Sequence, residues 1–344
     1  MGEFMRSIFS ITRNKLEEYF IDKGEKKFKA TQVFEWIYRK GVRSFEEMTN
    51  LKKETIDKLK EDFNFNEIKI VKKEEDELVK KYLFELSDGN KIESVLMVHD
   101  YGLSICISSQ IGCNMGCAFC ESGRLKKVRN LEVDEMLLQI MKVQDDIGER
   151  ISHVVVMGIG EPFDNYDNFI DFMNIVTDPY GLAIGQRHIT VSTSGIVPKI
   201  KLFADLESGV NLAISLHAPN NKLRSSIMKI NNAYNIEEII DAIKYYLDKT
   251  NRRVTFEYIM LKDVNDTDEC AIELSKLLKG INCYVNLIPY NETENIEFKR
   301  SNTSQIARFY DILKKNNINV TIRKEFGSNV SAACGQLRAK VEGE

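Results

Sequence analysis

The sequence contains no apolar run that approaches the about 20 residues needed to cross a bilayer. Its first residues lack the charged region and apolar stretch of a secretory signal. No Gly-x-Gly-x-x-Gly loop follows the first strand expected after residue 100, which disfavours dinucleotide binding. The formal net charge of -4 gives no global indication of a nucleic-acid partner. These absences lead us to expect a cytoplasmic protein with no membrane partner. The sequence leaves the oligomeric state open, and a monomer is the default expectation.

The 344 residues are 43% apolar, which is enough for a sizeable core in one large domain, or in one with a smaller appendage. The chain contains 7 cysteines. Without an export signal they are expected to stay reduced, because disulfides are rare in reducing compartments. Clustered cysteines in such a chain act more often as metal ligands or catalysts than as disulfide partners.

From residue 103 onward the pattern is strand, loop and helix, repeated. We predict strands over 103–108, 153–157, 188–192, 211–216, 254–260 and 284–288, with a further strand over 319–323. Helices are expected between them, for example over 133–147, 236–247 and 268–278. This alternation predicts an α/β fold of parallel strands with crossover helices, arranged as an open sheet or a full or partial barrel.

Residues 7–64 have helical apolar spacing and are expected to form short helices. The charge-rich segment 52–77 is expected to be an exposed helix and a connection, and 82–86 and 91–97 a β-hairpin. We therefore divide the chain into a helical accessory domain (5–80), a β extension (81–100) and a core domain (101–340). Residues 23–40 carry six basic residues against two acidic ones, with aromatic residues between them. Alone, this pattern is typical of a helix with one solvated face.

The unusual residues of the core follow the predicted strands. A cysteine loop follows the first strand and 158–162 (GIGEP) follows the second. Ser192 to Gly195, Ser215 to His217 and 289–291 (PYN) end later strands. Carboxyl ends of parallel strands are the edge where barrel folds place their active sites. We expect these segments to form one composite site.

Cys113, Cys117 and Cys120 can reach three corners of a compact cluster from one loop. Only three thiolates would leave one iron open for a further ligand. A structural zinc site is the main alternative, but it normally has four ligands in paired spacing. No second Cys-x-x-Cys pair exists in the sequence, and Cys270 and Cys283 are isolated. The pattern favours an iron–sulfur cluster over zinc.

The motif Cys-x-x-x-Cys-x-aromatic-Cys, with Phe119 as the aromatic residue, resembles the signature of radical S-adenosylmethionine enzymes. The resemblance covers about residues 93–337 and points in particular to the RlmN-type methyltransferases, which modify adenine C2 in 23S ribosomal RNA and transfer RNA. The matching stretches are 106–113 (CISSQIGC), 157–162 (MGIGEP), 191–195 (VSTSG), 212–220 (LAISLHAPN), 286–291 (NLIPYN) and 332–337 (AACGQL). The basic N-terminal segment also resembles the RNA-binding helical appendage of that family.

The resemblance implies a radical-SAM partial (β/α) barrel of about six parallel strands, with a small N-terminal helical domain and a β-hairpin extension. It implies that Cys113, Cys117 and Cys120 hold a [4Fe-4S] cluster whose open iron binds S-adenosylmethionine. The residues expected to contact S-adenosylmethionine are Gly160, Glu161, Ser192, Ser215, Leu216, His217 and Asn291. The implied partners are 23S rRNA and tRNA, a flavodoxin-like electron donor and a thiol reductant.

The family's mechanism, carried over to matching positions, gives roles to three further residues. Cys334 would take a methyl group from one S-adenosylmethionine, and a radical made from a second one would remove a hydrogen atom from that methyl. The carbon radical would add to adenine C2. Glu93 would accept a proton, and Cys106 would attack Cys334 to release the product through a transient disulfide. From the residues alone, Glu93 could equally face solvent, Cys106 could merely pack, and His217 could be a core histidine.

The sequence departs from the family at Glu121, beside the third cysteine, and in the segment Ser328-Asn329-Val330-Ser331 before Cys334. Relatives carry small neutral residues at the first place and aspartates at the second. Two other functions stay open at this stage. One is a Cfr-type enzyme that methylates adenine C8 in 23S rRNA and confers antibiotic resistance. The other is a non-catalytic, metal-stabilised RNA-binding module.

Overall fold

A computed structural model describes residues 5–293 and 295–323 of the chain. Its main sheet has ten strands in the order β14-β13-β12-β11-β10-β9-β6-β5-β4-β3. Seven neighbouring strands are parallel, which are β6 (Gly102–Cys106), β9 (His153–Val156), β10 (Ile189–Thr193), β11 (Asn211–Ser215), β12 (Val254–Met260), β13 (Cys283–Pro289) and β14 (Asn319–Ile322). The six predicted strands and the further one are confirmed, because each is a short apolar run between turn residues.

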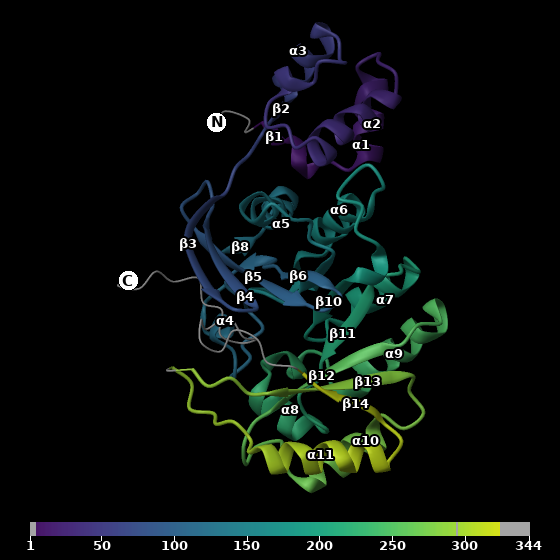
Figure 1. Cartoon of the computed structure of the whole chain (residues 1–344). Coiled ribbons are helices and arrows are strands. Elements are labelled where there is room, and N and C mark those ends of the chain that lie inside the picture. The colour runs from purple at the N-terminus through teal and green to yellow at the C-terminus, as the bar shows by residue number, and fades with distance from the viewer. Residues whose placement is uncertain (1–4, 294, 324–344) are drawn as a thin grey trace.

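Helices cross over between these strands and lie along one side of the sheet (Figure 1). They are α5 (Val133–Ile147), α6 (Tyr166–Thr177), α7 (Val197–Asp205), α9 (Ile236–Thr250), α10 (Asp268–Leu277) and α11 (Thr303–Lys315). The three predicted helices are confirmed, with α9 three residues longer than expected.

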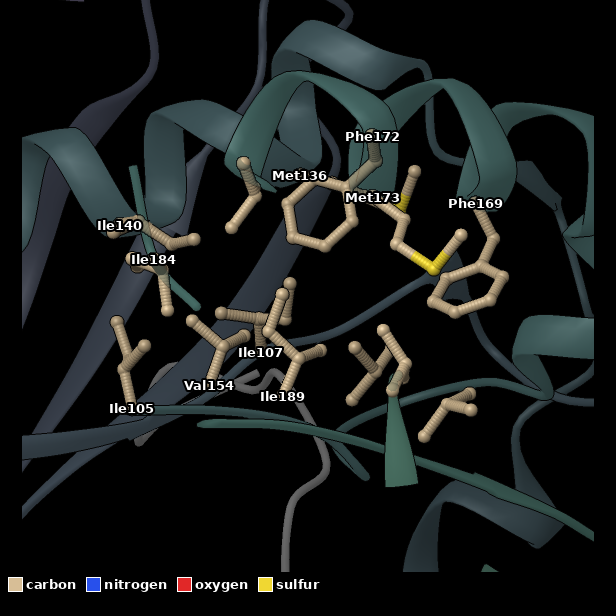
Figure 2. Packing of buried hydrophobic residues seen from close by; sticks show 14 of the residues in the cluster. Ile105, Ile107, Met136, Ile140, Val154, Phe169, Phe172, Met173, Ile184 and Ile189 are labelled. Atoms are coloured by element: carbon tan, nitrogen blue, oxygen red, sulfur yellow. The ribbon is translucent and has the colours of Figure 1, made fainter. Parts of the chain in front are cut away.

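The outer face of the sheet packs against α5 and α6 (Figure 2). Ile105, Val154 and Ile189 come from three adjacent strands, and Met136 and Phe172 meet them from the helices. Successive side chains of a strand point to opposite faces. Since Ile105 points toward the helices, the neighbouring Cys106 points toward the inner face.

An antiparallel extension continues the sheet at its other end, through β5 (Lys91–His99), β4 (Val79–Glu85) and β3 (Lys69–Asp76). The predicted hairpin is confirmed as β4 and β5. The expectation that 52–77 is a helix and a connection is wrong in its second half, because that half forms β3. The sequence did not predict this strand because most of its residues are charged. Its acidic side chains pair across the ladder with β4, where Lys81 lies 3.1 Å from Glu74, and such charges suit an edge strand exposed to water.

The N-terminal region contains α1 (Arg13–Asp22), α2 (Phe28–Phe34) and α3 (Lys53–Asp62), with short turns η1 (Ile8–Ser10), η2 (Glu35–Arg39) and η3 (Phe45–Glu47). Strands β1 (Arg6–Ser7) and β2 (Phe63–Asn64) close it as a two-stranded parallel sheet. The helical region therefore ends before β3 begins at Lys69, which is earlier than the division at residue 80. A truncation at residue 80 would remove β3 from the main sheet.

This region packs on α5 and α6 at one end of the molecule (Figure 1). Its apolar side chains belong to the same continuous core as the sheet. Charged contacts reinforce the joint, with Arg13 2.9 Å from Asp178 and Lys15 2.5 Å from Asp171. Among the described residues, no helix is both long and apolar enough to span a membrane.

Candidate active site

A pocket opens at the carboxyl ends of the parallel strands and brings together segments that are far apart in sequence. The cysteine loop and the ends of β9 to β13 contribute to it. Its lining residues are Cys113, Met115, Cys117, Phe119, Cys120, Ser122, Val156, Met157, Gly158, Gly160, Glu161, Pro162, Ser192, Thr193, Ser194, Ser215, His217, Met228, Glu257, Ile259, Ile288 and Arg323. The predicted set is thus largely gathered in one place. Leu216 and Asn291 are not among the lining residues.

The cysteine loop is held by backbone contacts on both sides. The short strands β7 (Gln110–Ile111) and β8 (Arg129–Asn130) pair just before and after it. Gly112 adopts a left-handed φ of 72°, and a Cβ there would lie 2.2 Å from the Lys126 carbonyl oxygen. Further along, the Ala118 amide donates to the Ile227 carbonyl at 2.9 Å, and Cys117 forms a β-bridge with Met228. The positions of the cysteines are therefore fixed by the chain itself.

The three thiols form a soft donor set that faces the pocket. Burial raises the pKa of Cys113 to about 12 and raises the pKa of Cys117 well above its ordinary value. Thiolates in this position therefore need a bound cation to be stable, and iron is such a cation. Within the described ranges, no group of three or more His, Cys, Asp or Glu side chains is placed to bind a single metal ion. The arrangement fits a multinuclear iron–sulfur cluster with three protein ligands better than a four-ligand zinc site.

Glu161 lines the pocket and links two of the strand-end loops. Its side chain is 3% exposed. One carboxylate oxygen accepts the Phe163 amide at 3.0 Å and the other accepts the Ser194 amide at 2.7 Å. Burial raises the pKa of Glu161, and these hydrogen bonds from the backbone oppose the rise. The carboxylate keeps further lone pairs that can accept hydrogen bonds from a bound cation.

The neighbouring Gly160 has a left-handed φ of 111° and lies against Gln110. A Cβ at this position would lie 2.6 Å from the Gln110 Cβ, so no larger residue fits without movement. Gln110 in turn accepts the Glu161 amide at 2.9 Å and donates to Asp164 at 2.9 Å. The close approach of the two loops explains why glycine precedes Glu161.

The ends of β10 and β11 supply hydroxyl groups. The side-chain oxygens of Ser192 and Ser215 lie 3.3 Å apart, and both residues line the pocket. Leu216 turns its side chain into the core and its amide donates to the Glu257 carbonyl at 3.1 Å. Asn291 follows the end of β13 and is half-buried. The two serines are thus better placed to meet a ligand in the pocket than Leu216 or Asn291.

His217 is neutral and holds a defined tautomer. The Ile259 backbone amide, which can only donate, lies 3.0 Å from His217 Nδ1. Nδ1 is therefore the acceptor, and the ring proton resides on Nε2. Burial lowers the pKa of this imidazole to about 3. His217 thus lines the pocket as a neutral hydrogen-bond donor rather than as a cation.

This depressed pKa predicts a loss of stability in acid. The unfolded chain protonates His217 near pH 6.5, whereas the folded chain does so near 3, so the folded state binds fewer protons between these values. The contribution of neutral His217 to the free energy of unfolding is fully present above about pH 6.5. Below that pH it falls by about 1.4 kcal/mol for each pH unit. His217→Asn is a suitable comparison, because asparagine tolerates the left-handed φ of 59° and offers an acceptor to Ile259.

Urea denaturation at pH 7 and pH 5 measures the effect. The unmodified protein should lose about 2 kcal/mol more than His217→Asn over this interval. An equal loss in the two proteins would mean that His217 titrates normally in the folded chain.

Glu93 and Cys106 lie beside the pocket rather than in its lining. Cys106 is directly opposite Val95 on the neighbouring antiparallel strand, so Glu93, two residues from Val95, shares its face. Cys106 is 7% exposed and packs in a small cluster with Val95 and Met157, and Met157 also lines the pocket. Glu93 is 2% exposed, with Lys81 at 3.4 Å, so it does not face open solvent. Cys334 lies outside the described residues.

Two charged lining residues, Glu257 and Arg323, were not among the residues predicted from the sequence. Glu257 is 5% exposed and accepts a hydrogen bond from Asn286 at 2.8 Å. Burial raises the pKa of its carboxyl, and the positive charge of Arg323 opposes that rise. The sequence carries a signal for Glu257, because it is the one charged residue in the mostly apolar strand 254–260.

The unusual Glu121 begins the short helix α4 (Glu121–Arg124) and is buried, but it is not a lining residue. Its carboxylate accepts a hydrogen bond from Asn295 at 3.3 Å. This contact directs its charge toward the loop after β13. The departure at 328–331 lies outside the described residues.

Comparison with known proteins shows similarity over nearly the whole chain. The family model of the radical SAM superfamily matches residues 107–274, and that of the ribosomal RNA large subunit methyltransferase N-terminal domain matches residues 7–64. A relative from Listeria welshimeri, named "Probable dual-specificity RNA methyltransferase RlmN", is 56% identical over 97% of this chain and 94% of its own length. A relative of the same name from Streptococcus thermophilus is 55% identical over 98% of this chain and 90% of its own length.

A solved structure is also similar along the whole length. The radical SAM methyltransferase from Sphaerobacter thermophilus has a TM-score of 0.90 and 39% identity, covering 97% of this chain and 100% of that chain. The N-terminal helices and the sheet therefore occur together in this relative as well.

Proposed function

This chain belongs to the RlmN family of radical S-adenosylmethionine methyltransferases, and we propose that it methylates C2 of an adenosine in 23S ribosomal RNA and in transfer RNA. The observation that carries the proposal is the single pocket in which three cysteines meet Glu161, two serines and His217. Adenine C2 is an electron-poor aromatic carbon that cannot simply displace the methyl group of a sulfonium. A radical route removes that obstacle, and the cofactor supplies it.

Cys113, Cys117 and Cys120 would hold a [4Fe-4S] cluster in the pocket. When bound and reduced, this cluster supplies the electron that cleaves S-adenosylmethionine into methionine and a 5′-deoxyadenosyl radical. The protein's part is to bind and orient. Glu161 accepts hydrogen bonds from the methionine amino group, and the Ser192 and Ser215 hydroxyls and the His217 Nε2–H meet the remaining polar groups. Gly160 lines the pocket and would meet the ligand through its backbone, whereas Leu216 and Asn291, which do not line it, belong to the proposed set through the family resemblance alone.

Three residues of the chain would handle the methyl group. Cys334 receives it as a thioether, and the derived carbon radical adds to adenine C2 and links the protein to RNA. Glu93 would take the proton from C2, and the unpaired electron of the adduct would return to the oxidised cluster. The Cys106 thiol would then attack the Cys334 sulfur, form a disulfide and pass its proton to the released carbon, which leaves as the methyl group of the product. The common face of Glu93 and Cys106, next to the pocket-lining Met157, supports this assignment. An external thiol reductant then restores both cysteines.

The reaction needs partners outside the chain. A flavodoxin-like protein would supply low-potential electrons to the cluster. The target adenosine has to leave its stack to reach a pocket at the strand ends, so the RNA site should be a loop or bulge. We place the enzyme in the cytoplasm, where such RNA is found, and expect it to act as a monomer.

The N-terminal helices would hold the RNA. Lys26, Lys27 and Phe28 are adjacent and exposed at the start of α2, and the Phe28 side chain is 52% exposed. Neither lysine forms an ion pair among the residues that the structure describes, so both charges are available to phosphates. An exposed aromatic ring beside free cations suits a nucleic-acid contact through stacking and charge.

The double substitution Lys26→Gln and Lys27→Gln should weaken RNA binding without affecting cleavage of S-adenosylmethionine. If each lysine contacts one phosphate, the slope of log affinity against log salt concentration falls by roughly 1.5. Filter binding at several salt concentrations measures it. Substitution of the exposed lysines Lys244 and Lys249 of α9 serves as the control. If the salt slope and the affinity of the Lys26→Gln, Lys27→Gln variant were unchanged, these two lysines would not belong to the RNA-binding site.

Nucleoside analysis tests the proposed reaction. RNA treated with the anaerobically reconstituted protein, S-adenosylmethionine and a reductant is digested and separated by liquid chromatography and mass spectrometry. The proposal predicts 2-methyladenosine. Exclusive 8-methyladenosine would instead assign the Cfr-type reaction, and the absence of both methylated adenosines and 5′-deoxyadenosine would contradict an enzymatic role.

A further inference from the structure

Arg224 is a charged side chain that is completely buried. It lies in α8 (Asn221–Ile227), which follows the end of β11, and its exposure is 0%. Among the residues that the structure describes, it is the largest fully buried side chain. Arginine is rarely buried to this degree without a carboxylate partner. Among the described residues, no carboxylate lies within ion-pair distance of it.

Neutral acceptors satisfy the whole guanidinium group. Nε donates to the Leu216 carbonyl at 3.1 Å, and one terminal nitrogen donates to the carbonyls of Ser194 at 2.6 Å and Ser215 at 3.1 Å. The other donates to the Asn231 side-chain oxygen at 3.0 Å and the Tyr234 carbonyl at 3.4 Å. A guanidinium has five N–H donors, and all five have an acceptor here. Arg224 therefore has no donor left for a ligand, and it acts through position and charge.

The three strand-end carbonyls connect Arg224 to the pocket. Ser194 and Ser215 line it, and Leu216 precedes the lining residue His217. The segment that carries Arg224 also holds the cysteine loop, since Ile227 accepts the Ala118 amide and Met228 bridges to Cys117. The charge of Arg224 is close enough to Cys117 for the two groups to interact electrostatically, and α8 ends next to the bridge between Met228 and Cys117. The position of Arg224 is therefore fixed by the hydrogen bonds of its side chain and by the backbone contacts of residues 227 and 228.

Neutral acceptors satisfy the hydrogen bonds of Arg224 but leave its positive charge uncompensated, so a nearby anion would stabilise it. Three thiolates on a [4Fe-4S] cluster give an anionic assembly, and one further electron makes it more negative by one unit. A fixed cation nearby stabilises the more negative state more strongly, because the interaction grows with the charge. We propose that Arg224 is a positioning residue whose buried charge favours the one-electron reduction of the cluster held by Cys113, Cys117 and Cys120.

The proposal rests on the proposed function, because it requires that cluster. The electron comes from a low-potential one-electron reductant, such as dithionite in the test, and reduction of the cluster forms and breaks no bond. Positive charge at Arg224 makes electron uptake more favourable and so shifts the midpoint potential upward. Removing or neutralising that charge should shift it to more negative values.

Two kinds of variant separate charge from structure. Arg224→Gln removes the cation, whereas Arg224→Lys keeps it and loses the five-donor fork. Asn231 offers an independent approach, as it is 5% exposed and contacts Arg224 but no cysteine in any described hydrogen bond. Asn231→Asp places a carboxylate next to the Arg224 guanidinium, and its negative charge compensates the positive charge of Arg224 without removing the arginine. Asn231→Ala loses the same amide hydrogen bonds without adding charge.

The midpoint potential of each reconstituted full-length protein is measured by redox titration monitored by electron paramagnetic resonance, alongside iron content. Arg224→Gln and Asn231→Asp should both shift the potential to more negative values. Arg224→Lys and Asn231→Ala should shift it less. If Arg224→Gln does not fold, Asn231→Asp against Asn231→Ala gives the same comparison.

Unshifted potentials in Arg224→Gln and Asn231→Asp, with full iron content, would overturn the proposal and leave the proposed function intact. Equal loss of iron in all four variants would also overturn it, since the role would then be structural. An unmodified protein without a redox-active cluster would contradict the proposed function itself, and this inference with it.

Discussion

Replacing Cys117 with alanine should abolish cluster binding and reduce 5′-deoxyadenosine formation to the background of iron-free protein. The variant loses one of three thiolates, and a cluster with two protein ligands is exposed to loss of iron. The loop itself should keep its shape, because the Ala118 amide and the Met228 bridge hold it through the backbone. The loss can then be attributed to the missing ligand rather than to unfolding.

Iron and sulfide analysis after anaerobic reconstitution measures the first effect, and chromatography of 5′-deoxyadenosine the second. Cys270→Ala is the matched control. Cys270 lies half-buried on α10 and does not line the pocket, so this variant should retain both iron and activity. Full iron content and cleavage in Cys117→Ala would show that the triad is not the ligand set.

Substituting Glu161 with glutamine should weaken S-adenosylmethionine binding roughly ten- to hundredfold, since a lost hydrogen bond to a charged group costs about 1.5–3 kcal/mol. The two carboxylate oxygens accept the amides of Phe163 and Ser194. A glutamine has only one oxygen, so its NH₂ group would face one of these N–H donors. The loop after β9 would shift, and the group proposed to meet the methionine amine would become a donor.

Isothermal titration calorimetry on the reconstituted variant measures the affinity. Glu135→Gln is a useful control, because it breaks the bidentate pair with Arg129 at 2.7 Å but lies on α5 outside the pocket lining. That control should lose stability and retain affinity. An unchanged affinity in Glu161→Gln would exclude Glu161 from the S-adenosylmethionine site.

The sequence predicted the order of strands and helices in the core because each strand is an apolar run bounded by turn residues. It did not predict β3, whose lysines and glutamates suit an edge strand but match no strand pattern. The sequence also predicted most of the pocket, because the unusual residues follow the strands and parallel strands bring their carboxyl ends to one edge.

The features that the sequence did not predict depend on contacts between distant segments. Nothing local indicates that Glu161 accepts the Ser194 amide, or that Ile259 fixes the tautomer of His217. Arg224 is a further case. A lone arginine in a short helix is expected to face solvent, and only the arrival of three carbonyls from β10 and β11 ends explains its burial.

One measurement tests the whole account most directly. The reconstituted protein is given RNA, a reductant and S-adenosylmethionine with a trideuterated methyl group, and the products are analysed by mass spectrometry. Transfer through a methylated cysteine, with removal of one hydrogen atom by a radical, predicts 2-methyladenosine with two deuterium atoms and 5′-deoxyadenosine with one. A methylated adenosine that retains all three deuterium atoms would mean direct transfer of the intact methyl group and would contradict the radical site described here.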